Sequence, residues 1–142
     1  MRRDARKIAF SLIYEYLFTN EKDDLSLEQF IKKEDADDTV FEITGSDKAF
    51  IVDIYNNVVN NLDVYRKKVA ALAEGFKEER LFKVDLAILM MAFYEIDTKS
   101  TPIEVVINEA VGLAKTYSTD NSAGFINGIL AQYVKDKDTK SE

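Results

Sequence analysis

The chain has 142 residues, 46% of them hydrophobic, which fits one globular domain with its own core. It contains no Cys and no His, which excludes disulfides, thiolate or imidazole metal sites, and catalytic groups built on either residue. The formal charge of -7 argues against a non-specific nucleic-acid binder and leaves room only for a local basic patch. The longest apolar run, residues 86–93, is too short to cross a membrane, so we expect a cytoplasmic protein without membrane contact.

The first half of the chain shows helical spacing in three places. Apolar residues over 8–17 fall on one face of an expected first helix. A capping box that starts at Ser26 predicts a second helix, and the acidic stretch 34–38 after it is expected to be a loop. A longer pattern over 46–74 is expected to divide into two further helices at the pair Asn60–Asn61.

The second half of the chain predicts three more helices. Residues 84–96 are apolar nearly all round, which is typical of a helix buried on most sides, so we expect this one to be central. The sequence Thr101-Pro102-Ile103-Glu104 has the cap, the first-turn proline and the acid of a helix start, and this helix should reach about Tyr117. A last helix follows, and the charged segment 135–142 is expected to be a flexible tail. We therefore predict an all-α fold of about seven helices in a single domain, 1–134.

Basic residues are concentrated at the start of the chain. Arg2, Arg3, Arg6 and Lys7 place four cations in six residues, and Arg6 lies one helical turn after Arg3. Arginine suits RNA because its planar fork binds phosphate and stacks on bases. These cations are also disfavoured at a helix N-terminus by the helix dipole, so stability does not explain them. The alternative interpretation is a solvated helix start with no ligand.

Two other segments are candidates for contacts. The turn 118–122 precedes the last helix, and the free backbone N–H groups of such a helix start attract phosphate. The alternative is that Asn121 or Ser122 simply caps this helix. Glu78, Glu79 and Asp85 form an acidic edge before the central helix, which predicts either dipole stabilisation or contact with a basic partner.

Three sequence blocks together resemble one known family. They are Arg2-Arg3-Asp4-Ala5-Arg6 leading into a helix with Tyr14, VDLAILMMAFYEI at 84–96, and PIEVVINEAVGLAKTYSTDNSAGFINGIL at 102–130. Within the last block, the INEAV-x-LAK and F-[IV]-N-G-[IV]-L motifs are the most specific. The chain resembles the NusB family of bacterial transcription antitermination factors over about residues 2–134.

The resemblance implies a fold of two packed helical bundles and a function without catalysis or cofactor. Family members bind the boxA element of ribosomal RNA together with NusE, a basic small-subunit ribosomal protein, and act on RNA polymerase with other Nus factors. It also implies an RNA-binding side and a NusE-facing side. The RNA-binding candidates are Arg2, Arg3, Arg6, Tyr14, Lys115, Tyr117, Asn121 and Phe125, and the partner-binding candidates are Glu78, Glu79 and Asp85.

Three positions depart from the usual family pattern. Ser11, Met90 and Gly124 stand where many members carry a basic or amide side chain. This motivates a first alternative, a protein-interaction adaptor of the same fold with weak or no RNA binding. A second alternative is a fragment of a ribosomal RNA methyltransferase, which the absence of a catalytic Cys and of a cofactor-binding glycine loop disfavours. Some family members self-associate, so a homodimer is also possible.

Overall fold

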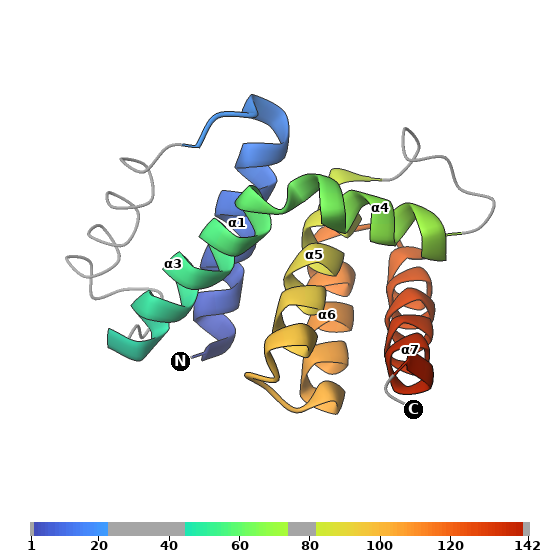
Figure 1. Cartoon of the computed structure of the whole chain (residues 1–142). Coiled ribbons are helices and arrows are strands. Elements are labelled where there is room, and N and C mark those ends of the chain that lie inside the picture. The colour runs from blue at the N-terminus through green and yellow to red at the C-terminus, as the bar shows by residue number, and fades with distance from the viewer. Residues whose placement is uncertain (1, 23–44, 74–81, 141–142) are drawn as a thin grey trace. The chain divides into compact units, whose positions relative to one another are not determined.

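The computed structural model describes residues 2–22, 45–73 and 82–140, and in these ranges the regular elements are all helices. Figure 1 shows them in chain order. They are α1 (Arg2–Thr19), α3 (Gly45–Asn60), α4 (Leu62–Leu72), α5 (Lys83–Thr98), α6 (Ile103–Tyr117) and α7 (Ser122–Lys140). The predicted all-α class is confirmed. The helix expected from Ser26, the acidic loop 34–38, and Glu78 and Glu79 lie outside the described residues.

The helices form two compact units, residues 1–60 and 61–142. In the first unit α1 packs against α3, and in the second α5 contacts α4, α6 and α7. Each unit buries its own apolar residues, such as Ile13 and Ile54 in the first and Phe93 and Leu130 in the second. This division agrees with the two helical bundles that the resemblance implied.

The predicted central helix is confirmed as α5, in the second unit. Ile88, Leu89, Met90 and Met91 follow one another and so point to four different sides of the helix, and each of them is at most 3% exposed. A helix that is apolar nearly all round is buried on most sides, and α4, α6 and α7 all contact α5 (Figure 1). The helix ends at Lys99, whose φ of 55° is left-handed and stops the helical path.

Two predicted helix boundaries can be compared with the structure. The division at Asn60–Asn61 is confirmed, with α3 ending at Asn60 and Asn61 in the cap position of α4. The start of α6 is one residue later than predicted, because Pro102 takes the cap position in place of Thr101. The Thr101 hydroxyl donates instead to the buried Glu95 carboxylate, over 2.9 Å, and so ties the segment before α6 to α5.

The end of the chain differs from the expected flexible tail. Helix α7 continues through Lys140, so most of segment 135–142 is helical. The Asp97 carboxylate of α5 accepts hydrogen bonds from Lys137, from the Tyr133 hydroxyl over 2.5 Å and from Lys68 of α4 over 3.4 Å. The sequence prediction missed this anchor because alternating charges are also typical of a frayed end.

This Asp97 cluster changes the acidity of its members. Burial alone would raise the pKa of Asp97, but the hydrogen bonds from Lys137 and Tyr133 and the charge of Lys68 outweigh it and lower that pKa. Burial, followed by the Asp97 charge, raises the pKa of Tyr65 to about 12. Burial, followed by the hydrogen bond to Asp97, raises the pKa of Tyr133. Both tyrosines are therefore neutral at physiological pH, and Tyr133 keeps the proton that it donates to Asp97.

Candidate functional site

The basic start of α1 divides between two faces of the helix. Arg2 and Arg6 both face α3, with their guanidinium carbons 4.3 Å and 5.7 Å from the centre of the Phe50 ring. The Arg2 Nε also donates to the buried Asp47 carboxylate over 3.1 Å. Arg6 is only 5% exposed. The prediction of Arg6 as a phosphate contact is therefore corrected: its side chain is part of the α1–α3 packing.

The seven-residue spacing explains this burial of Arg6. A helix repeats its facing direction almost completely after seven residues, and Ile13, seven residues later, is fully buried. This signal was present in the sequence. It was outweighed by the rule that charged residues at a helix start are exposed.

The other face of α1 carries basic and aromatic side chains at helical spacing. Arg3 is exposed and Lys7 is half-buried at the start of the helix, and Tyr14 and Phe18 follow further along. Tyr14 stacks on Phe10 with ring centres 5.9 Å apart and meets Phe18 edge-on at 4.9 Å. Phe18 is 61% exposed, although the sequence did not predict it as a site residue. We call Arg3, Lys7, Tyr14 and Phe18 the α1 stripe.

The second group of candidates lies at the corner between α6 and α7, in the second unit. Lys115 and Asn121 are exposed, and Tyr117 is 46% exposed. Asn121 precedes the first residue of α7, and its carbonyl oxygen accepts the Phe125 amide over 3.3 Å, as a cap residue does. We call Lys115, Tyr117 and Asn121 the α6–α7 corner. These three predicted residues lie within seven residues of one another, from the last turn of α6 to the residue before α7.

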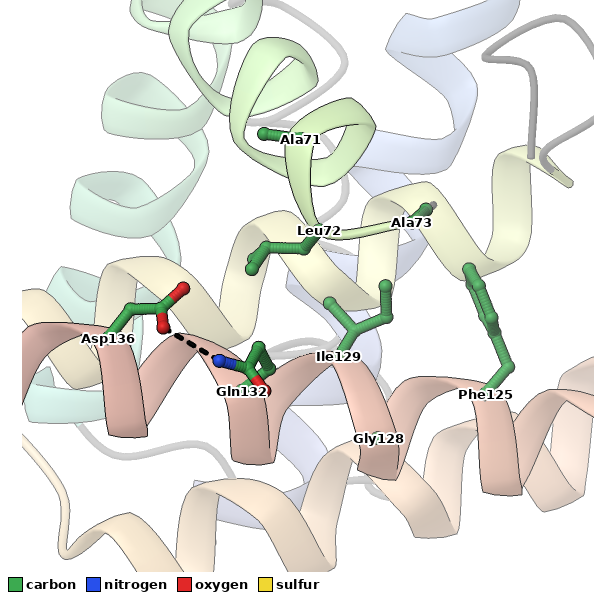
Figure 2. Close-up of a pocket in the computed structure, with 8 residues that line it drawn as sticks. All are labelled: Ala71, Leu72, Ala73, Phe125, Gly128, Ile129, Gln132 and Asp136. Atoms are coloured by element: carbon green, nitrogen blue, oxygen red, sulfur yellow. Dashed lines mark hydrogen bonds between the residues drawn. The ribbon is translucent and has the colours of Figure 1, made fainter. Parts of the chain in front are cut away.

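Phe125, the remaining RNA-binding candidate of α7, lines a groove. Figure 2 shows its ring over a groove between α4 and α7, together with Ala73, Ile129 and Gln132. The groove has a volume of about 560 Å³, and Phe125 is half-buried. The residue therefore lines the side of the second unit that α4 and α7 form.

Asp85 is not part of an exposed acidic edge, which corrects the sequence prediction. It is 4% exposed in the first turn of α5. One carboxylate oxygen accepts the Ser118 hydroxyl over 2.6 Å, and the other accepts the Ser122 hydroxyl over 3.0 Å. A carboxylate enclosed in this way contributes little to the electrostatic attraction of a basic partner. The other two predicted partner contacts, Glu78 and Glu79, lie outside the described residues.

Residues 2–22, 45–73 and 82–140 contain neither a cluster of metal ligands nor a membrane-spanning helix. In these ranges no group of three or more acidic side chains is placed to hold a metal ion. Among the same residues, no helix combines the length and the apolar character needed to span a bilayer.

Comparison with known proteins now decides the family. The family model described as "NusB family" matches residues 3–135. The chain belongs to the NusB family. It is 37% identical to the transcription antitermination protein NusB of Acetivibrio thermocellus, over 96% of this chain and 90% of that protein. It is also 37% identical to the NusB of Finegoldia magna, over 99% of this chain and 98% of that protein.

A solved structure supports the same assignment. The NusB structure of T. maritima superposes with a TM-score of 0.78 at 30% sequence identity, covering 95% of this chain and 91% of that one. The structure also locates the three residues that depart from the usual family pattern. Met90 is fully buried in α5, so it lies in the core, whereas Ser11 and Gly124 are exposed.

Proposed function

We propose that this protein is a transcription antitermination factor that binds boxA-type RNA together with NusE in the cytoplasm. In this proposal it carries out no chemistry, requires no cofactor, and joins RNA polymerase through other Nus factors. The observation that supports it most is 37% identity, over nearly the whole chain, to proteins named transcription antitermination protein NusB. Relatives aligned from end to end usually share a function as well as a fold.

The α1 stripe supports an RNA-binding role on physical grounds. Single-stranded RNA is bound by cations that follow its phosphates and by aromatic rings on which bases stack. Arg3 and Lys7 provide the cations, and Tyr14 and Phe18 provide ring surface further along the same helix. The distance from residue 3 to residue 18 along an α-helix is about 22 Å, because each residue adds about 1.5 Å. That length accommodates several nucleotides.

The α6–α7 corner supplies a second set of RNA contacts in this proposal. Lys115 can pair with phosphate, Tyr117 can stack on a base, and the Asn121 amide can bond to a base edge. Arg2 is partly available as well, since its side chain is 40% exposed beside Asp47. Phe125, which lines the groove beside α4, is a weaker candidate than these residues.

The NusE contact rests on family membership and on overall charge. A chain with a net charge of -7 attracts a basic ribosomal protein, and opposite charges accelerate such an encounter. Because Asp85 is enclosed, this attraction must come from other acidic residues.

Titration of a boxA RNA oligonucleotide tests the proposal. Fluorescence anisotropy is recorded with and without NusE at several salt concentrations, and a scrambled oligonucleotide of equal length measures non-specific binding. Each phosphate contact contributes about -0.7 to the slope of log affinity against log salt for a single strand. We expect tighter binding to boxA than to the scrambled RNA, and tighter still with NusE.

A matched pair of variants locates the contact. Arg3→Ala removes a cation from the α1 stripe, whereas Lys67→Ala removes one from an exposed position on α4. We expect only Arg3→Ala to weaken boxA binding. If the parent protein binds NusE but shows no preference for boxA in its presence, the protein-interaction adaptor replaces the proposed function.

A further inference from the structure

The buried carboxylate of Asp85 joins the end of one helix to the start of another. Ser118 is the cap residue that follows α6, and Ser122 is the first residue of α7. Asp85 accepts a hydrogen bond from each of them, although they lie 33 and 37 residues further along the chain. One side chain of α5 therefore holds both ends of the four-residue connection.

The hydroxyl groups around Asp85 are also hydrogen-bonded to one another. Ser122 Oγ lies 2.8 Å from Ser118 Oγ and 2.9 Å from Thr119 Oγ1. The backbone adds to this, because the Ser122 amide donates to the Thr119 carbonyl over 3.0 Å and the Ser118 amide to Ala114 over 2.9 Å. Hydrogen bonds that share partners in this way strengthen one another and favour a single loop conformation.

The α6–α7 corner lies directly on this set of bonds. Tyr117 immediately precedes Ser118, and Asn121 immediately precedes Ser122, so the two exposed residues are adjacent to the two serines that Asp85 holds. We propose that Asp85 is a positioning residue for RNA binding: it fixes the α6–α7 corner from beneath without touching RNA. This inference rests on the proposed function, and it explains what holds the α6–α7 corner in shape for RNA binding.

In an Asp85→Ala variant, the effects of lost charge and of lost corner geometry on RNA affinity have opposite signs. Replacement by Ala changes the net charge from -7 to -6, which by electrostatics alone favours binding to RNA. A loss of RNA affinity in Asp85→Ala would thus have to come from the loss of corner geometry. A binding surface that becomes ordered only on binding has a lower affinity, because the ordering costs free energy.

The main experiment compares Asp85→Ala with Asp97→Ala. Both changes remove one hydrogen-bonded carboxylate from the same helix, but Asp97 binds Lys137, Tyr133 and Lys68, away from the corner. Both variants should lose thermal stability. We expect about a fivefold to twentyfold loss of boxA affinity for Asp85→Ala, from the lost preorganisation, and less than twofold for Asp97→Ala.

A second variant reaches the same contact from the other side. Ser122 is 2% exposed and cannot meet RNA, so any effect of Ser122→Ala on RNA binding must pass through the corner. The charge is unchanged in this variant. We expect a smaller loss than for Asp85→Ala, and no full further loss in the double variant, since the two side chains act on one contact. Ser122→Ala also decides the matter if Asp85→Ala fails to fold.

Two further readouts separate positioning from general destabilisation. Amide hydrogen exchange over 118–122 should accelerate in Asp85→Ala and remain at the parent rate in Asp97→Ala. NusE affinity should stay within twofold of the parent in both. Folded Asp85→Ala and Ser122→Ala proteins that bind boxA as tightly as the parent would overturn this inference alone. A parent protein without boxA preference would overturn the proposed function, and this inference with it.

Discussion

Arg3 and Arg6 carry the same charge three residues apart, and we predict opposite consequences for their removal. Arg3→Ala should reduce RNA affinity with little effect on folding, because the Arg3 side chain is exposed on the α1 stripe. Arg6→Ala should destabilise the first unit with little effect on the salt dependence of RNA binding, because Arg6 is 5% exposed against α3. Both changes alter the net charge by the same amount, so each variant is the control for the other.

The expected magnitudes follow from the two environments. Losing one phosphate contact flattens the salt slope by about 0.7, so over a fourfold rise in salt the parent loses about 2.6-fold more affinity than Arg3→Ala. For Arg6, the guanidinium carbon lies 5.7 Å from the Phe50 ring centre, near the limit of a cation–π contact, and its alkyl stem is buried as well. We expect Arg6→Ala to lower the free energy of unfolding by about 1–3 kcal/mol.

Two assays on each variant are sufficient. Urea denaturation followed by circular dichroism gives the free energy of unfolding, and boxA anisotropy at 50–200 mM salt, on the order of the physiological range, gives the slope. The reasoning would be refuted if Arg6→Ala flattened the slope while retaining the stability of the parent. That result would place the Arg6 side chain in contact with RNA and not against Phe50.

Three further predictions concern stability. Leu89→Ala, in the fully buried middle of α5, should cost about 2–5 kcal/mol in urea denaturation, and a loss below about 1 kcal/mol would contradict its central position. Folding lowers the pKa of Asp97, so the ionised carboxylate stabilises the protein above the ordinary aspartate pKa, and this stabilisation is lost as the pH falls through the lowered pKa. In urea denaturation between about pH 7 and 2, the parent should therefore be more stable than Asp97→Asn at neutral pH, and the difference should disappear at the acid end. Gly112→Ala should stabilise the protein by about 0.5–1 kcal/mol, because a Cβ there meets nothing within 4 Å and α6 is exposed at that point; an unchanged or lower melting temperature would argue against it.

Sequence patterns predicted the elements better than the contacts between them. The segment 84–96 is apolar nearly all round, which indicates a helix buried on most sides, and α5 has that form. The paired Asn60–Asn61 marked the division between α3 and α4 because both residues are poor in a helix interior and favourable at its ends.

The errors concern charged residues whose partners lie far away in the chain. Nothing near Asp85 in sequence indicates Ser118 or Ser122, so its charge was interpreted as solvated and available to a partner. The same holds for Lys137, which was assigned to a flexible tail although Asp97 lies 40 residues before it. Burial of a charged group becomes visible only when the tertiary partner that compensates it is known.

The Asp97 cluster has a practical consequence for how the protein is produced. A sequence-based design would trim the charged end after residue 134 to help crystallisation. That cut would remove Lys137, and of the two cations that the described residues place on Asp97, only Lys68 would remain. Tyr133 would then be next to the C-terminal residue, whose free carboxylate is negative like that of Asp97 and would repel it. Affinity tags and fluorescent labels therefore belong after Lys140, so that all of α7 is kept.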